Sequence, residues 1–399
     1  MRIQHILVIT LALFHVGTGP ALAETNTLFL EDFLKLVQTQ SLDIQVEKSI
    51  NDESQAKAQG TRIPPPMIGV MNMKDSGGVN RGIEISQELP FPTKIFKEKD
   101  VRELEAQAQN TNFRYRKNEI LLEARQSYFE YWKVYETKEI IEEKRTWLSS
   151  HLKLSRSLTR SDTSAQIHLL AIESEVDQLE NELLEMQSEL SEKRNQLKSI
   201  APGLVSQNFS PESQPKIEDI NIEKKMDSGL LIESKRVALD AAIADANLKK
   251  QAYLPDFTLR YRSYQGNEMN PRNEELMLGI SLPFLFFSQP HAEVAEASAK
   301  QQRAEVELQK EKLRIENQLD SQIERLKNMK TQYINMSQKL IPRANQRMKL
   351  VESLTVRSME GLDEHRMVML DYLELKQKEI NLRFEIEKLS LEILKLVSQ

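Results

Sequence analysis

Residues 85–91 read Ile-Ser-Gln-Glu-Leu-Pro-Phe, and residues 278–284 read Leu-Gly-Ile-Ser-Leu-Pro-Phe. Both segments close an alternating apolar stretch with Leu-Pro-Phe, and each lies between a hairpin-like segment and a long helical run. Two copies of one pattern in the same context indicate an internal duplication. We therefore expect each half of the chain to contain a helix, two strands, a long helix and a returning helix.

Two segments of the second half are the predicted strands of one hairpin. Residues 257–263 and 276–282 alternate apolar and polar side chains, and turn-forming residues lie between them. Each segment approaches the roughly 10 residues that a strand needs to cross an outer membrane with its apolar side chains facing lipid. In that arrangement Arg260 and Arg262 face a watery barrel lumen. A hairpin of a soluble protein would show the same alternation, so the pattern alone leaves both alternatives open.

The first half carries a weaker version of this hairpin. Residues 67–73 alternate poorly, and the expected turn lies at residues 76–78. A shorter helix is expected before each hairpin, over residues 30–59 and 228–252, because the prolines that follow stop a helix and begin an extended segment.

Outside the predicted strands, apolar residues recur at heptad spacing with charged and polar residues between them, which predicts coiled-coil seams. The seams consist of Leu121, Ala124, Tyr128, Tyr131 and Tyr135; of Ile172, Val176, Leu179, Leu183, Met186, Leu190 and Leu197; and of Leu375, Leu382, Ile386, Leu389, Ile393 and Leu396. Another helix is expected over residues 293–354, and a helix of about 55 residues from Thr93 onward would extend roughly 80 Å. The seams alone would equally fit a periplasmic coiled-coil scaffold protein, which has no use for strands with an apolar face.

The first 23 residues have the features of a secretory signal peptide. Arg2 precedes an apolar run over residues 6–14, and Ala21-Leu22-Ala23 supplies the small residues of a cleavage site. The mature chain is therefore expected to begin near Glu24. The apolar run is shorter than the ~20 residues of a membrane-spanning helix.

The composition argues against several classes of function. The chain has no cysteine, which excludes disulfides, thiolate metal sites and cysteine nucleophiles. Charged residues reach 29% and aromatic residues only 6%, a balance that favours long solvated helices over a compact enzyme. The net charge of −6 gives no basis for nucleic-acid binding.

No catalytic constellation is found in the sequence. The histidines His151, His168, His291 and His365 are scattered and lack the spacing of metal ligands. Neither a glycine-rich phosphate loop nor a nucleophile elbow is present. Methionines near the first hairpin are more commonly lipid-facing or gap-filling residues than soft metal ligands. We therefore expect no enzyme, no cofactor and no metal site.

Further motifs follow one another in a specific order. They are Tyr253-Leu254-Pro255-Asp256-Phe257 at the start of the third strand, Leu340-Ile341-Pro342-Arg343-Ala344 within a helix, and Lys376-Gln377 and Asn381-Leu382-Arg383-Phe384 in the final helix. Together with the two Leu-Pro-Phe copies, they make the chain similar to TolC-type outer-membrane efflux proteins over nearly the whole mature length. Residues 87–94, Gln-Glu-Leu-Pro-Phe-Pro-Thr-Lys, most resemble the branch that serves heavy-metal cation pumps, where a glycine usually stands at the place of Thr93.

The resemblance implies a mainly α-helical fold with a small β part. Each protomer would contribute its long coiled-coil helices to a periplasmic helical barrel and four strands to a trimeric, twelve-stranded transmembrane β-barrel. Four strands cannot close a barrel alone, and open strand edges are not tolerated in lipid. A homotrimer therefore follows from the requirement that every strand is paired.

The resemblance also implies a function, which is the exit duct of a tripartite efflux system in the outer membrane of a Gram-negative bacterium, with the helices in the periplasm. The implied partners are two further copies of the chain, outer-membrane lipid, a periplasmic adaptor protein and an inner-membrane pump of the resistance-nodulation-division type. Selectivity in such an assembly resides mostly in the pump, so the sequence does not identify the exported substrate. Heavy-metal cations are the candidate that the branch similarity indicates.

The predicted organisation has four parts. They are a signal peptide at residues 1–23, a first structural repeat at 24–200, an equatorial connector at 201–225 and a second repeat at 226–399. Pro342 lies inside a predicted helix, where a proline usually breaks the helix. Because the family has a proline near its equatorial region, we expect a kink at Pro342 and not a helix end.

The two helical pairs are expected to turn near residues 157–163 and 354–361, which would form the periplasmic tips. The resemblance places an acidic gate after the second turn, where three-fold symmetry makes a ring that favours cations. The gate candidates are Asp363 and Glu364, with Asp162 and Asp371 as further candidates, although an acid at a helix start can also serve only the helix dipole. The expected adaptor-docking residues are Leu158, Thr159, Arg160, Ser161, Met359, Gly361 and Leu362.

Overall fold

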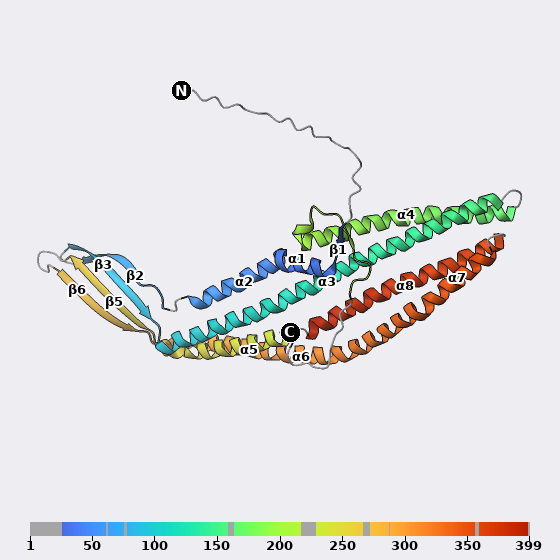
Figure 1. Cartoon of the computed structure of the whole chain (residues 1–399). Coiled ribbons are helices and arrows are strands. Elements are labelled where there is room, and N and C mark those ends of the chain that lie inside the picture. Colours follow the sequence, from blue (N-terminus) through green and yellow to red (C-terminus); the bar gives the residue numbers. More distant parts are fainter. Residues whose placement is uncertain are drawn as a thin grey trace, which may run out of the picture.

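Long helices extend from a small sheet at one end of the molecule to two pairs of helix ends at the other (Figure 1). The computed structural model describes residues 26–60, 63–75, 78–158, 163–216, 229–265, 272–286, 288–355 and 359–397. The helices are α1 (Leu30–Gln40), α2 (Leu42–Gln59), α3 (Pro92–Leu158), α4 (Thr163–Ile200), α5 (Leu230–Lys249), α6 (Ser288–Asn335), α7 (Ile341–Thr355) and α8 (Met359–Val397). The strands are β1 (Asn26–Leu28), β2 (Met67–Asp75), β3 (Gly78–Leu89), β4 (Phe209–Pro211), β5 (Phe257–Gln265) and β6 (Arg272–Ile280).

The four longer strands form one antiparallel sheet in the order β2-β3-β5-β6. The pair Leu89–Phe257 and the pair Phe257–Ile280 lie at the helical end of the sheet, while Asp75–Gly78 and Gln265–Arg272 close the two hairpins at the far end. The predicted strands of the second hairpin are confirmed, and the first hairpin is as long despite its weaker pattern. The central residues of the expected first turn, 76–77, lie outside the described residues.

Helix α3 has 67 residues, about 100 Å at 1.5 Å per residue, and is longer than the predicted helix of about 55 residues. Pro92 stands at its first position, where the fixed φ of proline suits a helix start. No further proline or glycine interrupts the chain up to Leu158, so the helix continues to the tip.

The predicted heptad seams form the core. On α3, Ala124, Tyr128 and Tyr131 are buried, and on α4 the buried seam residues are Ile172, Leu179, Leu183, Leu190 and Leu197. On α8, Ile386, Leu389, Ile393 and Leu396 are buried. Each seam packs against a neighbouring helix, and the buried residues form a series of clusters along the length of the molecule. Most of the predicted seam positions are therefore buried between helices, while the coiled-coil geometry itself stays a prediction.

The helix predicted over residues 30–59 is in fact two helices, α1 and α2, separated by Ser41. Ser41 has an extended backbone, with φ −60° and ψ 128°. The break lets α1 bury Phe33 and Val37 in the core beside Tyr128, while α2 follows α3. A straight helix could not satisfy both contacts, so tertiary packing overrides the uninterrupted helical pattern.

The helix predicted over residues 293–354 runs through α6, a π-helical turn at Met336–Leu340, and α7. Pro342 lies directly after the π-helical turn, so the chain remains helical through the proline as expected. A π turn widens the helix by one residue and accommodates the hydrogen bond that proline cannot donate. In Figure 1 the run curves between α6 and α7.

The connector after α4 adds a small sheet that the sequence did not predict. Its strand β4 pairs in parallel with β1, so that Asn26 lies opposite Phe209 and Leu28 opposite Pro211. Side chains of α3 hold this sheet by hydrogen bonds to backbone carbonyls: the Tyr128 hydroxyl donates to Leu28 over 2.6 Å, and the Tyr131 hydroxyl donates to Phe209 over 2.7 Å.

The connector is also attached to α8. The Arg383 guanidinium donates to the carbonyl of Pro215 over 2.6 Å and stacks on the Trp132 ring of α3. Close by, Arg125 of α3 makes a buried ion pair with Glu387 of α8. These contacts fix α3, α8 and the connector in one register at mid-length, residues 217–225 of the predicted connector lying outside the described residues.

Candidate functional site

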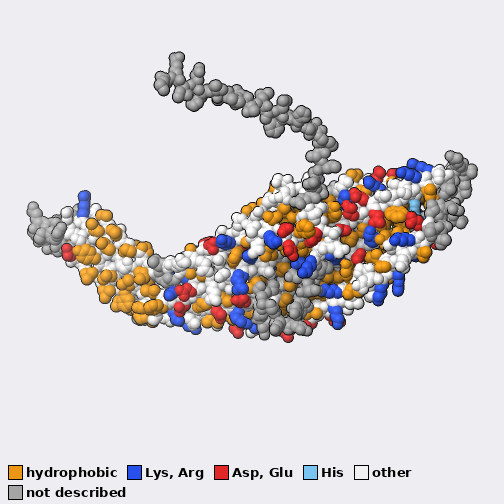
Figure 2. Space-filling view, in the orientation of Figure 1, with side chains coloured by type: hydrophobic (Ala, Val, Ile, Leu, Met, Phe, Trp, Pro, Cys, Tyr) orange, Lys and Arg blue, Asp and Glu red, His pale blue; other side chains and the backbone are white. Residues whose placement is uncertain are grey.

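One face of the sheet β2-β3-β5-β6 carries a broad band of apolar side chains that no other part of the described chain covers. Gln87 interrupts this band, and Asn72, Arg81, Ser263 and Glu274 border it towards the hairpin ends. The exposed members of the band are Ile68, Val70, Ile83, Ile85, Leu89, Leu259, Tyr261, Leu276, Leu278 and Ile280. Val70 is 88% exposed and Leu276 is 71% exposed, values that a buried sheet of a soluble domain would not show. Figure 2 shows hydrophobic side chains gathered over the sheet, in contrast to the mixed charges over the helices.

The opposite face of the sheet is polar and ion-paired at its centre. The carboxylate of Glu84 on β3 lies 3.1 Å from Arg260 Nε and 2.8 Å from Arg262 Nε on β5. Glu275 on β6 lies 3.6 Å from Arg262. Arg260 and Arg262 therefore share one face with the acids that neutralise them, opposite to the apolar face.

Both edge strands of the sheet lack a partner in the single chain. Strand β2 pairs only with β3, and strand β6 pairs only with β5, among the residues that the structure describes. Each edge therefore presents unpaired backbone N–H and C=O groups, which are a template for pairing with another chain.

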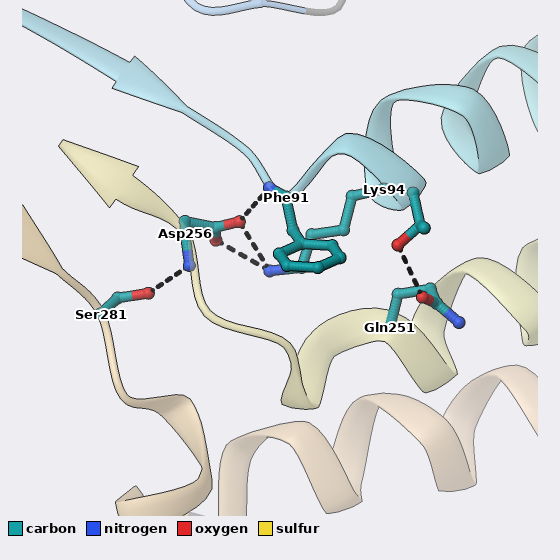
Figure 3. A network of polar contacts seen from close by, with 6 residues as sticks. Phe91, Lys94, Gln251, Asp256 and Ser281 are labelled. Atoms are coloured by element: carbon teal, nitrogen blue, oxygen red, sulfur yellow. Dashed lines mark hydrogen bonds and ion pairs between the residues drawn. The ribbon is translucent and has the colours of Figure 1, made fainter. Parts of the chain in front are cut away.

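The junction between the sheet and the helices is held by Asp256, a residue of the Tyr-Leu-Pro-Asp-Phe motif (Figure 3). Its carboxylate accepts a hydrogen bond from the amide of Phe91 over 2.9 Å and lies 2.8 Å from the ammonium of Lys94. Its own amide donates to the hydroxyl of Ser281 over 2.7 Å. Asp256 thus places a negative charge at the start of α3, where it interacts favourably with the helix dipole, and it joins the two Leu-Pro-Phe segments.

At the other end of the molecule, the predicted gate residues differ in their surroundings. Asp363 lies 3.0 Å from His168 Nδ1 of α4 and 3.7 Å from Arg366, so it has polar partners within the chain, one of them a cation. Glu364 is exposed and has no ion pair in the described part of the molecule. Asp371 is an exposed partner of Arg347 at 3.5 Å.

The remaining predicted tip residues lie at the ends of the described segments or outside them. Asp162 and the docking candidates Thr159, Arg160 and Ser161 lie outside the described residues. Leu158 ends α3 and Met359 begins α8, which places both next to the expected turns. Gly361 and Leu362 are described and buried, so Leu362 packs beneath the surface of the single chain.

Two histidines that the sequence analysis treated as scattered are in contact in the structure. His151 Nε2 of α3 lies 2.8 Å from His365 Nδ1 of α8, and both side chains are buried. The two residues are 214 positions apart, and neither neighbourhood carries a local motif that marks the contact.

Within the described ranges, no three His, Cys, Asp or Glu side chains lie together as a metal site. Over the same part of the chain, no helix is long and apolar enough to cross a membrane.

Comparisons with known proteins give matches in structure only. No family model matches the sequence, and no curated protein is similar to it in sequence. The CmeC outer-membrane channel of Campylobacter jejuni superposes with a TM-score of 0.76 at 12% identity, over 98% of this chain and 93% of that chain. The MtrE outer-membrane channel of Neisseria gonorrhoeae, in its open state, gives 0.78 at 11% identity, over 92% and 88%.

A third similar structure is CusC, described for its folding and transmembrane channel formation, with a TM-score of 0.74 at 14% identity over 94% of each chain. The chain has the fold of outer-membrane channels. This finding covers the whole described architecture, sheet and helices together, because the similar structures extend over nearly the full length of both chains.

Proposed function

We propose that this chain is a TolC-type outer-membrane factor, the exit duct of a tripartite efflux system. It would close as a homotrimer into a twelve-stranded barrel in the outer membrane, with its helices in the periplasm. The two-faced sheet is the observation that carries the proposal. An apolar face fits lipid, an ion-paired face fits a watery lumen, and strands of nine residues or more are about as long as membrane-spanning β-strands.

The trimer is proposed from the open edges. Strand β6 of one copy would pair with strand β2 of the next, because an unpaired edge in lipid leaves backbone groups without hydrogen bonds at several kcal/mol each. Ten or so such groups along each edge make the isolated chain unsuited to a bilayer. Three copies of four strands give the twelve-stranded barrel expected from the resemblance.

The same arrangement continues below the sheet. Helix α2 leads into β2, and α6 follows β6, so the two outer helices of each protomer would meet across the same boundary as the edge strands. Exposed apolar residues on α2 (Leu42, Val46 and Ile50) and on α6 (Val306 and Leu313) supply faces for that contact. Two closed rings, one of strands and one of helices, make a continuous duct.

The long helices would extend the duct into the periplasm, and their tips would bind the adaptor. Helix α3 alone extends about 100 Å, much longer than a small domain, and its far end forms part of the tip that would meet a periplasmic adaptor. An inner-membrane pump of the resistance-nodulation-division type would supply the energy. For the acidic gate, the exposed Glu364 is the stronger candidate, since Asp363 is paired with Arg366 and also contacts His168.

The identity of the exported substrate is the most specific point that we propose. Residues 87–94 resemble the heavy-metal cation branch, and heavy-metal cations are therefore the first substrates to test. Lys94 of that segment bonds to Asp256 at the junction, so this part of the similarity concerns the fold of the duct and not the recognition of a cargo.

Membrane fractionation tests the proposal with a matched pair of variants. Leu276 and Met277 are neighbours in β6 whose side chains point to opposite faces of the sheet. Leu276→Glu puts a charge on the apolar face at a cost on the order of 2 kcal/mol per chain in lipid. Met277→Glu puts the same charge on the polar face, opposite Arg260.

The wild-type protein and Met277→Glu should both sediment with outer membranes, resist salt extraction and give ion currents in planar bilayers. Leu276→Glu should reach the outer membrane in much smaller amounts. Recovery of the wild-type protein in the soluble periplasm would favour the coiled-coil scaffold instead. Equal amounts of the two variants in the outer membrane would contradict the assignment of the apolar face to lipid and of the polar face to the lumen.

A further inference from the structure

The first turns of α8 contact both neighbouring helices at the tip through a small group of polar side chains. Asp363 and Arg366 bind α4, at His168 and Glu175 respectively, with Arg366 Nη1 lying 2.9 Å from Glu175. Between them, His365 turns towards α3. The same short segment of α8 therefore holds one helix by ion pairs and the other by an imidazole.

The contact with α3 is a buried histidine pair. His151 is 5% exposed and His365 is 3% exposed, and their rings meet at 4.9 Å between centroids with a 2.8 Å N···N hydrogen bond. The ring of Trp147, one helical turn before His151, packs edge-on against His365 at 5.6 Å. One nitrogen of the hydrogen bond must carry a proton and the other must offer a lone pair, so the bond can form when both rings are neutral or when one is charged, but not when both are charged.

The two ring nitrogens that do not take part in the hydrogen bond between the histidines have no polar group in the described part of the chain to stabilise a charge by hydrogen bonding. His151 Nδ1 and His365 Nε2 are buried and have no hydrogen-bond partner among the described residues. A protonated imidazole carries a charge and donates from both nitrogens, so a first proton would leave a charged, buried N–H without an acceptor, and a second proton would also break the hydrogen bond between the rings.

The charged and titratable groups around the pair come from three helices. Asp363 and Arg366 lie on α8, Glu175 and His168 lie on α4, and Lys144 of α3 lies 3.7 Å from Glu175. These groups are already paired with one another. Burial, with further contributions from His365 and Arg366 that exceed the opposite effects of Asp363 and Glu175, lowers the pKa of His151 from 6.5 to about 4.

The histidine pair lies close to the tip-side ends of both α3 and α8. His151 lies seven residues before the end of α3 at Leu158, and His365 lies six residues after the start of α8 at Met359. Towards mid-length the α3–α8 seam continues as the apolar cluster of Leu148, Val368, Met369 and Leu373. The histidine pair is therefore a polar layer near the tip, with the apolar cluster on its mid-length side and the buried residues Ser155 and Leu362 on its tip side.

We propose that the His151–His365 pair is a proton-responsive latch, which holds α8 against α3 at neutral pH and releases the tip end of this seam when the surroundings acidify. Release lets water reach the rings and lets α8 move away from α3, which widens the tip. The effect on conduction rests on the proposed function, whereas the release of the seam does not.

The direction of the response follows from the geometry. The closed seam binds protons less readily than a hydrated seam, so acid favours the released form. The closed form has its full stability above pH 6.5 and loses it as the pH falls towards 4. If His151 titrates near its ordinary value in the released seam, the equilibrium shifts towards release by about 30-fold between pH 7.5 and pH 5.

Trp147 provides a direct readout of the seam. The chain has two tryptophans, so the Trp132→Phe background leaves Trp147 as the single emitter. In the detergent-solubilised full chain, Trp147 emission should shift to longer wavelength between pH 7.5 and pH 4.5, as water enters the seam. The His151→Gln and His365→Gln variants, which keep a hydrogen-bonding side chain without a titrating ring, should show no shift over this range.

Two further variants complete the design. His365→Arg places a permanent charge in the seam and should give the shifted emission already at pH 7.5, so the proposal remains testable if a glutamine variant folds poorly. His168→Gln is the matched control, because it removes a more exposed histidine at the same tip and should keep the pH response of the parent. A response that persists in His151→Gln with His365→Gln, or that disappears in His168→Gln alone, would overturn the latch.

Planar-bilayer currents test the proposed channel function separately from the opening of the histidine seam. If both hold, the current should rise on acidification in the parent and in His168→Gln, but not in the glutamine variants of the pair. Currents without pH response, together with a shift of Trp147 emission, would overturn the coupling of the seam to the entrance. Absence of current in every variant would refute the proposed function while the emission shift still supports the seam.

Discussion

Asp256 offers a local test of how the sheet is joined to the helices. Replacing it with alanine removes the acceptor of the Phe91 amide and the partner of Lys94. Loss of a charge-assisted hydrogen bond to a backbone amide costs about 2 kcal/mol. The half-exposed ion pair and the interaction with the α3 dipole add about 0.5 kcal/mol each. We therefore expect local opening of the junction to become easier by about 3 kcal/mol.

Asp256→Asn should be much milder than Asp256→Ala. Its amide oxygen can still accept the hydrogen bond from Phe91, so mainly the charge is lost, at about 1 kcal/mol. Asp100→Ala on α3 is the matched control, since it removes an exposed acid whose carboxylate lies 3.5 Å from Lys97 and which does not touch the junction. That change should cost less than about 0.5 kcal/mol.

Hydrogen exchange of the Phe91 amide measures these differences directly. A change of about 3 kcal/mol corresponds to exchange faster on the order of 100-fold, and about 1 kcal/mol to roughly 5-fold. Mass spectrometry of peptides that cover residues 86–96 in the detergent-solubilised protein gives the rates. If Asp256→Ala exchanged no faster than Asp256→Asn, or no faster than the Asp100→Ala control, the carboxylate would not be what holds the start of α3.

Three further outcomes follow from the described contacts. Tyr128→Phe removes a buried hydroxyl that donates to Leu28 and accepts from the Glu212 amide, and should lower the free energy of unfolding by about 2 kcal/mol in urea titrations, with Tyr135→Phe as a near-neutral control. Because burial lowers the pKa of His151 to about 4, the unfolding midpoint of the parent should fall between pH 6.5 and pH 4 more steeply than that of His151→Gln; parallel curves would contradict this. Glu364→Gln should reduce the preference for cations in reversal-potential measurements more than Asp363→Asn does, and the reverse order would assign the gate to Asp363.

The elements with a local signature were predictable. Alternation over residues 257–263 and 276–282 and heptad spacing on α4 and α8 depend on the periods of a strand and of a helix. These periods survive in the single sequence because one face of each element is apolar. The first hairpin shows the limit, since residues 67–73 form a strand although their alternation is poor.

Features that depend on distant partners were not predictable. Ser41 breaks a helix because Phe33 and Val37 must reach Tyr128, a residue about a hundred positions away. The β1–β4 sheet joins the start of the described chain to the connector beyond α4. Neither contact leaves a periodic pattern, and short parallel strands of three residues carry too little sequence to be recognised.

The candidate sites divide in the same way. Arg260 and Arg262 share one face of the sheet because strand alternation determines it, and their place in a barrel lumen stays a prediction. Their acidic partners Glu84 and Glu275 come from neighbouring strands. Asp363 and Glu364 were equivalent by sequence, and only the contact of α8 with α4 distinguishes the acid with polar partners from the exposed one.

The number of chains in the assembled particle is the most direct test of the central claim, because the open edges of β2 and β6 close only when copies pair. Static light scattering of the mature protein in detergent, with the detergent contribution removed, measures that number. Pairing of β6 with β2 of the next copy predicts a particle of three chains that persists on dilution. A stable monomer would contradict it, because a single sheet of four strands with two open edges cannot form a barrel in lipid.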